Sequence, residues 1–144
     1  MFSPVLWREH FAPFYDALFR HIQSHGLLAG CLFDGDIRAI LDDTLALRPD
    51  VVEMVQPNLV GLETWGQKLR GRIASKASVD MMTTLATGSP DDCRAEARKL
   101  VATLATPEGG FVGISLRWHR PEYPRANVLA VAEAFNEYRR PALP

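Results

Sequence analysis

The stretch that decides the fold is LLAGCLFDGD, residues 27–36, an apolar run followed at once by two aspartates around a glycine. An apolar run of this length is typical of a strand that is buried on both faces. Similar runs follow at residues 51–55, 73–79 and 110–115, with helical patterns between them. Strands that alternate with helices pair in parallel through crossover connections. The sequence therefore predicts an α/β fold in which four parallel strands alternate with helices.

Length and composition indicate an ordinary globular protein. The 144 residues predict a single domain over residues 1–144, and 47% of them are hydrophobic and 23% charged. The net charge of -1 lacks the basic surplus that is typical of nucleic-acid or membrane-surface binders. No secretion signal follows Met1, and the two cysteines, Cys31 and Cys93, suit reduced thiols. We therefore expect a cytoplasmic protein.

Capping residues and prolines set the expected helix boundaries. Apolar residues at helical spacing predict a helix over residues 3–25, which Pro13 should split and Gly26 should end. A second helical pattern spans residues 62–69. Ser89 followed by Pro90 predicts the start of a longer helix, because serine is a good N-cap and proline fits the first helical position.

Polar side chains follow the first two predicted strands. In parallel α/β folds the carboxyl ends of the strands carry the active site. Asp34 and Asp36 could face a ligand there, or they could cap the next helix and bind turn amides. Gln56 and Asn58 could orient a substrate through neutral hydrogen bonds, or Asn58 could serve turn geometry.

The last two strands add charged candidates. Lys76, Ser78 and Asp80 alternate along the third predicted strand and so point to one side of it. Because burying these charges unpaired is costly, we expect a mutual Lys76–Asp80 ion pair or a solvated site.

A basic segment follows the fourth strand. His119 could act as an acid or base near neutral pH. Arg117 and Arg120 could bind carboxylates, or the segment could be a surface loop.

Two groups of sites lack sequence support. No Cys-x-x-Cys or His-x-Cys spacing occurs, so the sequence predicts no structural zinc site. No Walker lysine loop or Gly-x-Gly-x-x-Gly motif occurs, so it predicts no nucleotide site.

Four stretches, taken in order, carry a family resemblance. They are LFDGDIRAILDD (residues 32–43), VEMVQPN (52–58), GSPDD leading through a helix to GGF (88–111), and PRANV (124–128). This set resembles the C-terminal half of uroporphyrinogen decarboxylase-like (β/α)8 barrels, a family that includes cobalamin-dependent methyltransferases. By this resemblance residues 27–33 form the fifth barrel strand and residues 110–115 the eighth.

The resemblance implies a carboxy-lyase of porphyrin biosynthesis that acts on a carboxylated tetrapyrrole. It implies no metal or organic cofactor, because the pyrrole ring accepts the electrons. Methyl transfer to or from a small methylated compound is the second activity implied. Zinc-binding members carry His-x-Cys after the fifth strand, where this chain has Leu32 and Asp34. His119 is the candidate for the histidine that decarboxylases place after the eighth strand.

Two hypotheses follow for the C-terminal half-barrel. In the first, the chain is an enzyme domain with Asp34 and His119 as catalytic candidates. The substrate would be bound by Asp36, Gln56, Asn58, Lys76, Asp80, Arg117 and Arg120. In the second, it is a non-catalytic half-barrel that needs a partner chain. Four parallel strands leave two open edges and an uncovered inner face, so both hypotheses predict association. The partner would be a second copy or a complementary N-terminal half-barrel, and we expect neither a nucleic-acid nor a membrane partner.

Overall fold

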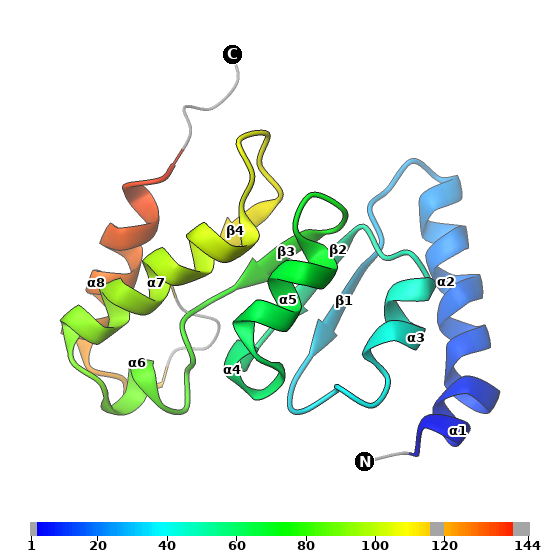
Figure 1. Cartoon of the computed structure of the whole chain (residues 1–144), viewed down its shortest axis with the longest axis horizontal. Helices are drawn as coiled ribbons and strands as arrows, with labels where there is room; N and C mark the ends of the chain where they lie inside the picture. Colours follow the sequence, from blue (N-terminus) through cyan, green and yellow to red (C-terminus); the bar gives the residue numbers. More distant parts are fainter. Residues whose placement is uncertain (1–2, 116–119, 140–144) are drawn as a thin grey trace.

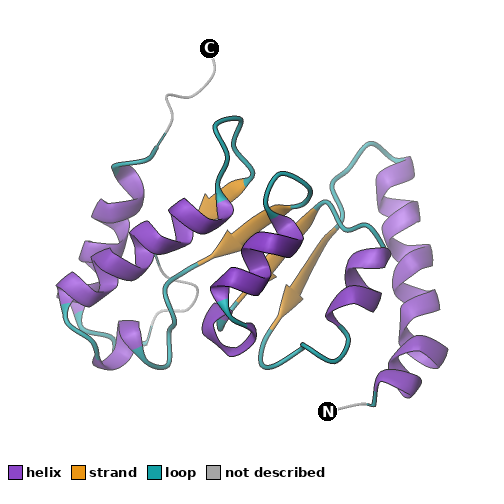
Figure 2. Cartoon of the chain, in the orientation of Figure 1, coloured by secondary structure: helices purple, strands orange, loops and turns teal. Residues whose placement is uncertain are grey.

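Four parallel strands form one sheet in the computed structural model, which describes residues 3–115 and 120–139 (Figures 1 and 2). The strands lie side by side in chain order: β1 (Gly30–Phe33), β2 (Val51–Met54), β3 (Ala74–Ala77) and β4 (Phe111–Gly113). Each neighbouring pair is parallel, and helices intervene between successive strands. This is the arrangement of half of a (β/α)8 barrel. The predicted α/β fold is confirmed.

The chain before β1 is helical but interrupted. It consists of α1 (Pro4–Leu6), the π-helical turn η1 (Trp7–Phe11) and α2 (Ala12–Ser24). The change from π to α geometry comes directly before Pro13, whose ring lacks the N–H that a continuous helix needs. Gly26 then takes a φ of 72° and ends the helix, as the sequence predicts.

The remaining helices connect or follow the strands. They are α3 (Leu41–Ala46), α4 (Pro57–Val60), α5 (Leu62–Leu69), α6 (Thr84–Thr87), α7 (Pro90–Leu104) and α8 (Arg125–Asn136). The bounds of α5 match the prediction, and α7 begins with a capping box. In it, Ser89 Oγ accepts from the Asp92 N–H at 3.2 Å, and the Asp92 carboxylate accepts from the Ser89 N–H at 2.9 Å.

The hydrophobic core lies between the sheet and its helices. Its largest fully buried side chains include Trp65, Leu69, Leu85, Leu100, Leu104, Val52 and Val131. Packing is close at β4, where a Cβ on Gly113 would lie 2.6 Å from Cγ of Phe135 in α8. Only glycine allows α8 to approach the strand this closely.

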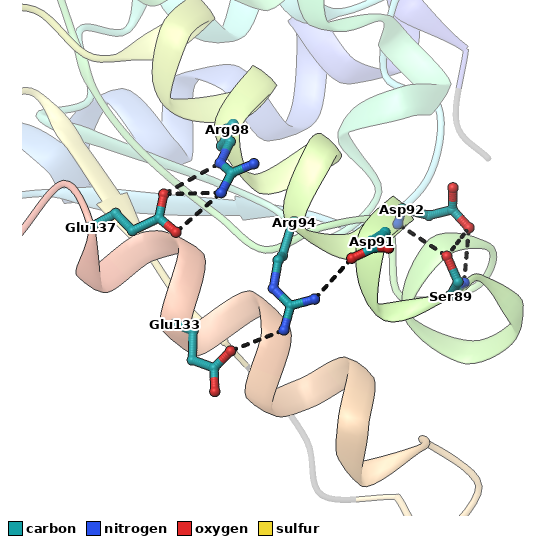
Figure 3. A network of polar contacts seen from close by, with 7 residues as sticks. All are labelled: Ser89, Asp91, Asp92, Arg94, Arg98, Glu133 and Glu137. Carbon is teal, nitrogen blue, oxygen red and sulfur yellow. Dashed lines mark hydrogen bonds and ion pairs between the residues drawn. The ribbon is translucent and has the colours of Figure 1, made fainter.

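Helices α7 and α8 are joined by ion pairs on their outer surface (Figure 3). Arg94 bridges Asp91 at 3.0 Å and Glu133 at 3.1 Å, and Arg98 binds Glu137 at 3.1 Å. Pairs as exposed as these contribute little stability. They lie over the interface through which α7 and α8 pack against each other.

Candidate functional site

One row of paired residues crosses the face of the sheet that the helices leave open. Leu32, Glu53, Lys76 and Val112 are register partners on the four successive strands. Their neighbours along the strands, such as Met54, are buried against the helices, and alternate residues point to opposite faces. Leu32 and Val112 remain 41% and 50% exposed. The open face thus presents two charged residues between two apolar ones.

The two charges in this row form an ion pair. Lys76 Nζ lies 3.0 Å from Glu53 Oε2, with the two side chains 37% and 15% exposed. Glu53 was not predicted as a site residue. Glu53 stands out in the sequence as a lone carboxylate within the apolar run VVEMV. Its pairing with Lys76 could not be predicted, because it depends on the register between β2 and β3.

The structure pairs Lys76 with Glu53 rather than with Asp80. Strand β3 ends at Ala77, so Asp80 lies in the following loop and not on the strand. Its carboxylate is almost fully buried and Oδ1 accepts from the N–H of Met82, the N–H of Thr83 and the Thr83 hydroxyl, each at 3.0 Å. Asp80 therefore shapes the loop that leads to α6.

The two aspartates after β1 differ in environment. Asp34 is exposed at the end of the strand, and Gly35 takes a φ of 97° that turns the chain. Asp36 accepts hydrogen bonds from the Arg38 side chain at 2.9 Å and from the Arg38 N–H at 3.0 Å. These bonds, the side-chain bond foremost, lower the pKa of Asp36 to about 2. Asp36 thus serves a local turn, whereas the Asp34 side chain is exposed.

A glutamate of α7 gathers the polar groups that follow β2 and β3. Glu96 Oε1 accepts from Asn58 Nδ2 at 2.9 Å and from the Asp80 N–H at 3.0 Å. Gln56 is half-buried directly before α4. Glu96 could not be found from the sequence as a site residue, because it lies mid-helix and far along the chain from either strand end.

A buried hydroxyl lies just beyond β3. Ser78 Oγ is buried and has no hydrogen-bond partner within residues 3–115 and 120–139. A buried hydroxyl of this kind is a ready donor or acceptor for a bound group.

The basic segment after β4 is only partly described. Arg117 and His119 lie outside the described residues. Arg120 is exposed, and its Nη1 lies 3.7 Å from Glu122 Oε1.

Two cavities flank the open edges of the sheet. One of about 350 Å³ lies between α2, β1 and α3, and another of about 650 Å³ lies between β4, α7 and α8. In a closed barrel, neighbouring strands and helices would occupy these positions. The structure therefore has one uncovered inner face, with a hollow at each edge.

Neither a metal centre nor a membrane helix is found in the described part of the chain. No three His, Cys, Asp or Glu side chains gather there as a metal site. His21 lies in the last turn of α2 and His25 caps its end, with ring centroids 4.6 Å apart, and Nδ1 of His25 is hydrogen-bonded to the His21 carbonyl at 2.9 Å. None of the helices described is long and apolar enough to cross a membrane.

Comparison with known proteins adds no assignment. No family model, curated protein or solved structure matches this chain.

Proposed function

We propose that this chain supplies the C-terminal half of the substrate site of a uroporphyrinogen decarboxylase-like barrel, a carboxy-lyase acting on a carboxylated tetrapyrrole. The observation that carries the proposal is the open sheet face, with its row of Leu32, Glu53, Lys76 and Val112. The resemblance of residues 32–43, 52–58, 88–111 and 124–128 to that family supplies the reaction class.

The chemistry of this face suits such a substrate. A tetrapyrrole offers apolar ring surfaces, inward N–H donors and carboxylates at its rim. Leu32 and Val112 are exposed apolar surfaces for the rings, and Lys76, which also pairs with Glu53, carries a cation for a rim carboxylate. Asp34 is an exposed carboxylate that can accept from pyrrole N–H groups.

The reaction makes electrostatic demands on the protein. The bond between the acetate carboxyl carbon and its methylene breaks, and its electron pair passes into the protonated pyrrole unit as CO₂ leaves. The methylene carbon then takes up a proton and becomes a methyl group, and the ring releases the proton that it had gained. The side chains of this half-site hold the substrate and stabilise charge as it develops on the ring.

A second candidate is a non-catalytic half-barrel that serves a partner chain. It is favoured by the local roles of several predicted site residues, because Asp36, Asn58 and Asp80 are all held in contacts within the chain. Under this candidate the open face is an association surface and binds no tetrapyrrole.

A fluorescence titration with uroporphyrin I, the stable oxidised form of such a substrate, separates the candidates. The enzyme proposal expects saturable binding that Lys76→Met weakens by about tenfold, the effect of losing one charge-assisted contact. The matched control is Lys99→Met, which removes a lysine from the exposed side of α7 and should leave binding unchanged. Absence of saturable binding, or equal loss in both variants, would favour the non-catalytic candidate. Saturable binding of hydroxocobalamin in place of the porphyrin would instead indicate the methyltransferase branch of the family.

A further inference from the structure

Exposed apolar side chains concentrate at the β1 end of the molecule. Of the twelve large hydrophobic residues that are exposed among those described, seven precede β2, namely Val5, Leu6, Phe14, Leu18, Leu27, Leu28 and Leu32. An apolar surface gathered in one region marks a contact site.

A groove opens beside this surface, and Leu18 and Leu32 line it. The cavity of about 350 Å³ has α2 and η1 on one side and β1 on the other, and Ile40, Thr44 and Leu47 of the α3 region close its third side. Trp7, Tyr15 and Leu18 line the helical side, and Trp7 and Tyr15 stack with ring centroids 5.5 Å apart. Gly30 and Leu32 line the strand side. The groove is therefore lined mostly by apolar side chains, and the outer edge of β1 forms one of its walls.

The strand wall is an open β-edge. β1 is the terminal strand of the sheet and pairs only with β2 among the described strands. The carbonyls of Ala29 and Phe33 accept from the N–H groups of Val51 and Val55, at 3.2 and 3.0 Å. Because alternate residues of a strand direct their main-chain groups to opposite sides, Gly30 presents its N–H and C=O to the groove, as does Leu32. A segment in extended conformation can form main-chain hydrogen bonds with such an edge.

We propose that this groove is the seat of a β-strand from a partner half-barrel, which pairs in parallel with the outer edge of β1 and packs alternate apolar side chains beneath α2. This inference rests on the proposed function in one respect, since both take the chain as half of a barrel. It does not require that the chain bind a tetrapyrrole. Main-chain pairing supplies the affinity of such strand addition, and alternate side-chain pockets supply its specificity.

A second copy of this chain does not fit the same groove. Helix α2 lies beyond β1 at one end of the molecule, and α8 covers β4 at the other (Figure 1). In a ring of eight strands made from two copies, β4 of one copy would pair with β1 of the other. Helix α8 of the first copy and α2 of the second would then have to occupy the same place outside that junction. A partner half-barrel that begins and ends on a strand brings no helix there, so it closes the ring without this overlap. The structure thus favours the complementary half over the homodimer.

Amide NMR on the full chain tests whether an extended segment binds in this groove. The probe is a soluble ten-residue peptide of alternating valine and threonine with lysine ends, and the control is the same peptide with two central prolines. The valine–threonine peptide should shift the amide signals of Gly30 and Leu32 and slow their hydrogen exchange at least tenfold. Leu32→Lys, which puts a charge on the edge, should abolish these changes. Val112→Lys, in the same row at the far edge, should leave them intact.

Other outcomes would overturn the proposal. Peptide shifts confined to the β4 edge, or no shifts at millimolar peptide, would show that the groove takes no strand. A concentration-dependent dimer that protects Gly30 and Leu32 without peptide would make a second copy the occupant. Strand binding without uroporphyrin binding would overturn the proposed function alone.

Discussion

Removal of one buried amide should loosen the C-terminal helix pair. Asn127 lies near the start of α8, and its side chain is almost fully buried. Its Nδ2 donates to the carbonyl of Leu85 at 2.9 Å and to that of Gly88 at 2.7 Å. Both carbonyls belong to the α6 region that leads into α7, so this one amide ties α8 to that turn. Asn127→Ala removes both bonds and leaves two carbonyls without this donor.

The size of the effect follows from these contacts. Each hydrogen bond contributes about 0.5–1.5 kcal/mol, and a buried group deprived of its partner adds a further cost, so we expect a loss of about 2–3 kcal/mol. For a domain of this size that corresponds to a fall in Tm of roughly 5–10 °C. Asn127→Asp should cost more, because it places a carboxylate against two carbonyl oxygens.

Urea unfolding followed by circular dichroism measures these losses as changes in the free energy of unfolding. Asn136→Ala is the matched control, since Asn136 is exposed at the end of the same helix and should change stability by less than about 0.5 kcal/mol. If Asn127→Ala behaves like Asn136→Ala, or Asn127→Asp is milder than Asn127→Ala, the assigned role of the amide is refuted.

Three further changes probe the fold and its charges. Gly113→Ala should lower the free energy of unfolding in urea by about 1–3 kcal/mol through overpacking against Phe135, and an unchanged midpoint would contradict the close approach of α8 to β4. Ser89→Ala should cost about 1 kcal/mol in the same assay by removing the α7 cap, and wild-type stability would show that the capping box is dispensable. Arg38→Gln should raise the pKa of Asp36 from about 2 toward the ordinary aspartate range, read from its carboxyl NMR shift. Because the folded pKa is depressed, the stabilisation from this pair is present above about pH 4 and falls as the pH drops toward 2. A stability difference between variant and wild type that is as large at pH 2 as at pH 7 would contradict this sign.

Much of the fold follows from local sequence patterns. Each apolar run became a strand, and the Ser89-Pro90 start of α7 was predicted from capping chemistry. The strands are shorter than the runs, because pairing continues only where a neighbour lies in register. β4 pairs with β3 over three positions, and the Ile114 N–H adds one bond to the Ala77 carbonyl just beyond the strand. The short helices α4 and α6 were missed because they depend on loop packing rather than on periodicity.

The candidate site was less predictable, because its contacts join distant segments. The sequence placed Lys76 on the sheet face, but its partner Glu53 depends on the register between β2 and β3. The local alternative for Asp36, a turn contact, could be drawn from its neighbours and is what the structure shows. Glu96 joins Asn58 to the Asp80 amide across three elements, a link that spacing along the chain does not reveal.

The most direct test of the central proposal maps where a tetrapyrrole contacts the chain. Uroporphyrin I added to isotope-labelled protein should shift the amide signals of Leu32, Glu53 and Lys76 on the open sheet face, together with Gln56 at the strand ends. The signal of Lys99 on the outer helix layer should stay in place. Shifts confined to the outer helices, or an unchanged spectrum at saturating porphyrin, would contradict the proposal that this face is half of a substrate site.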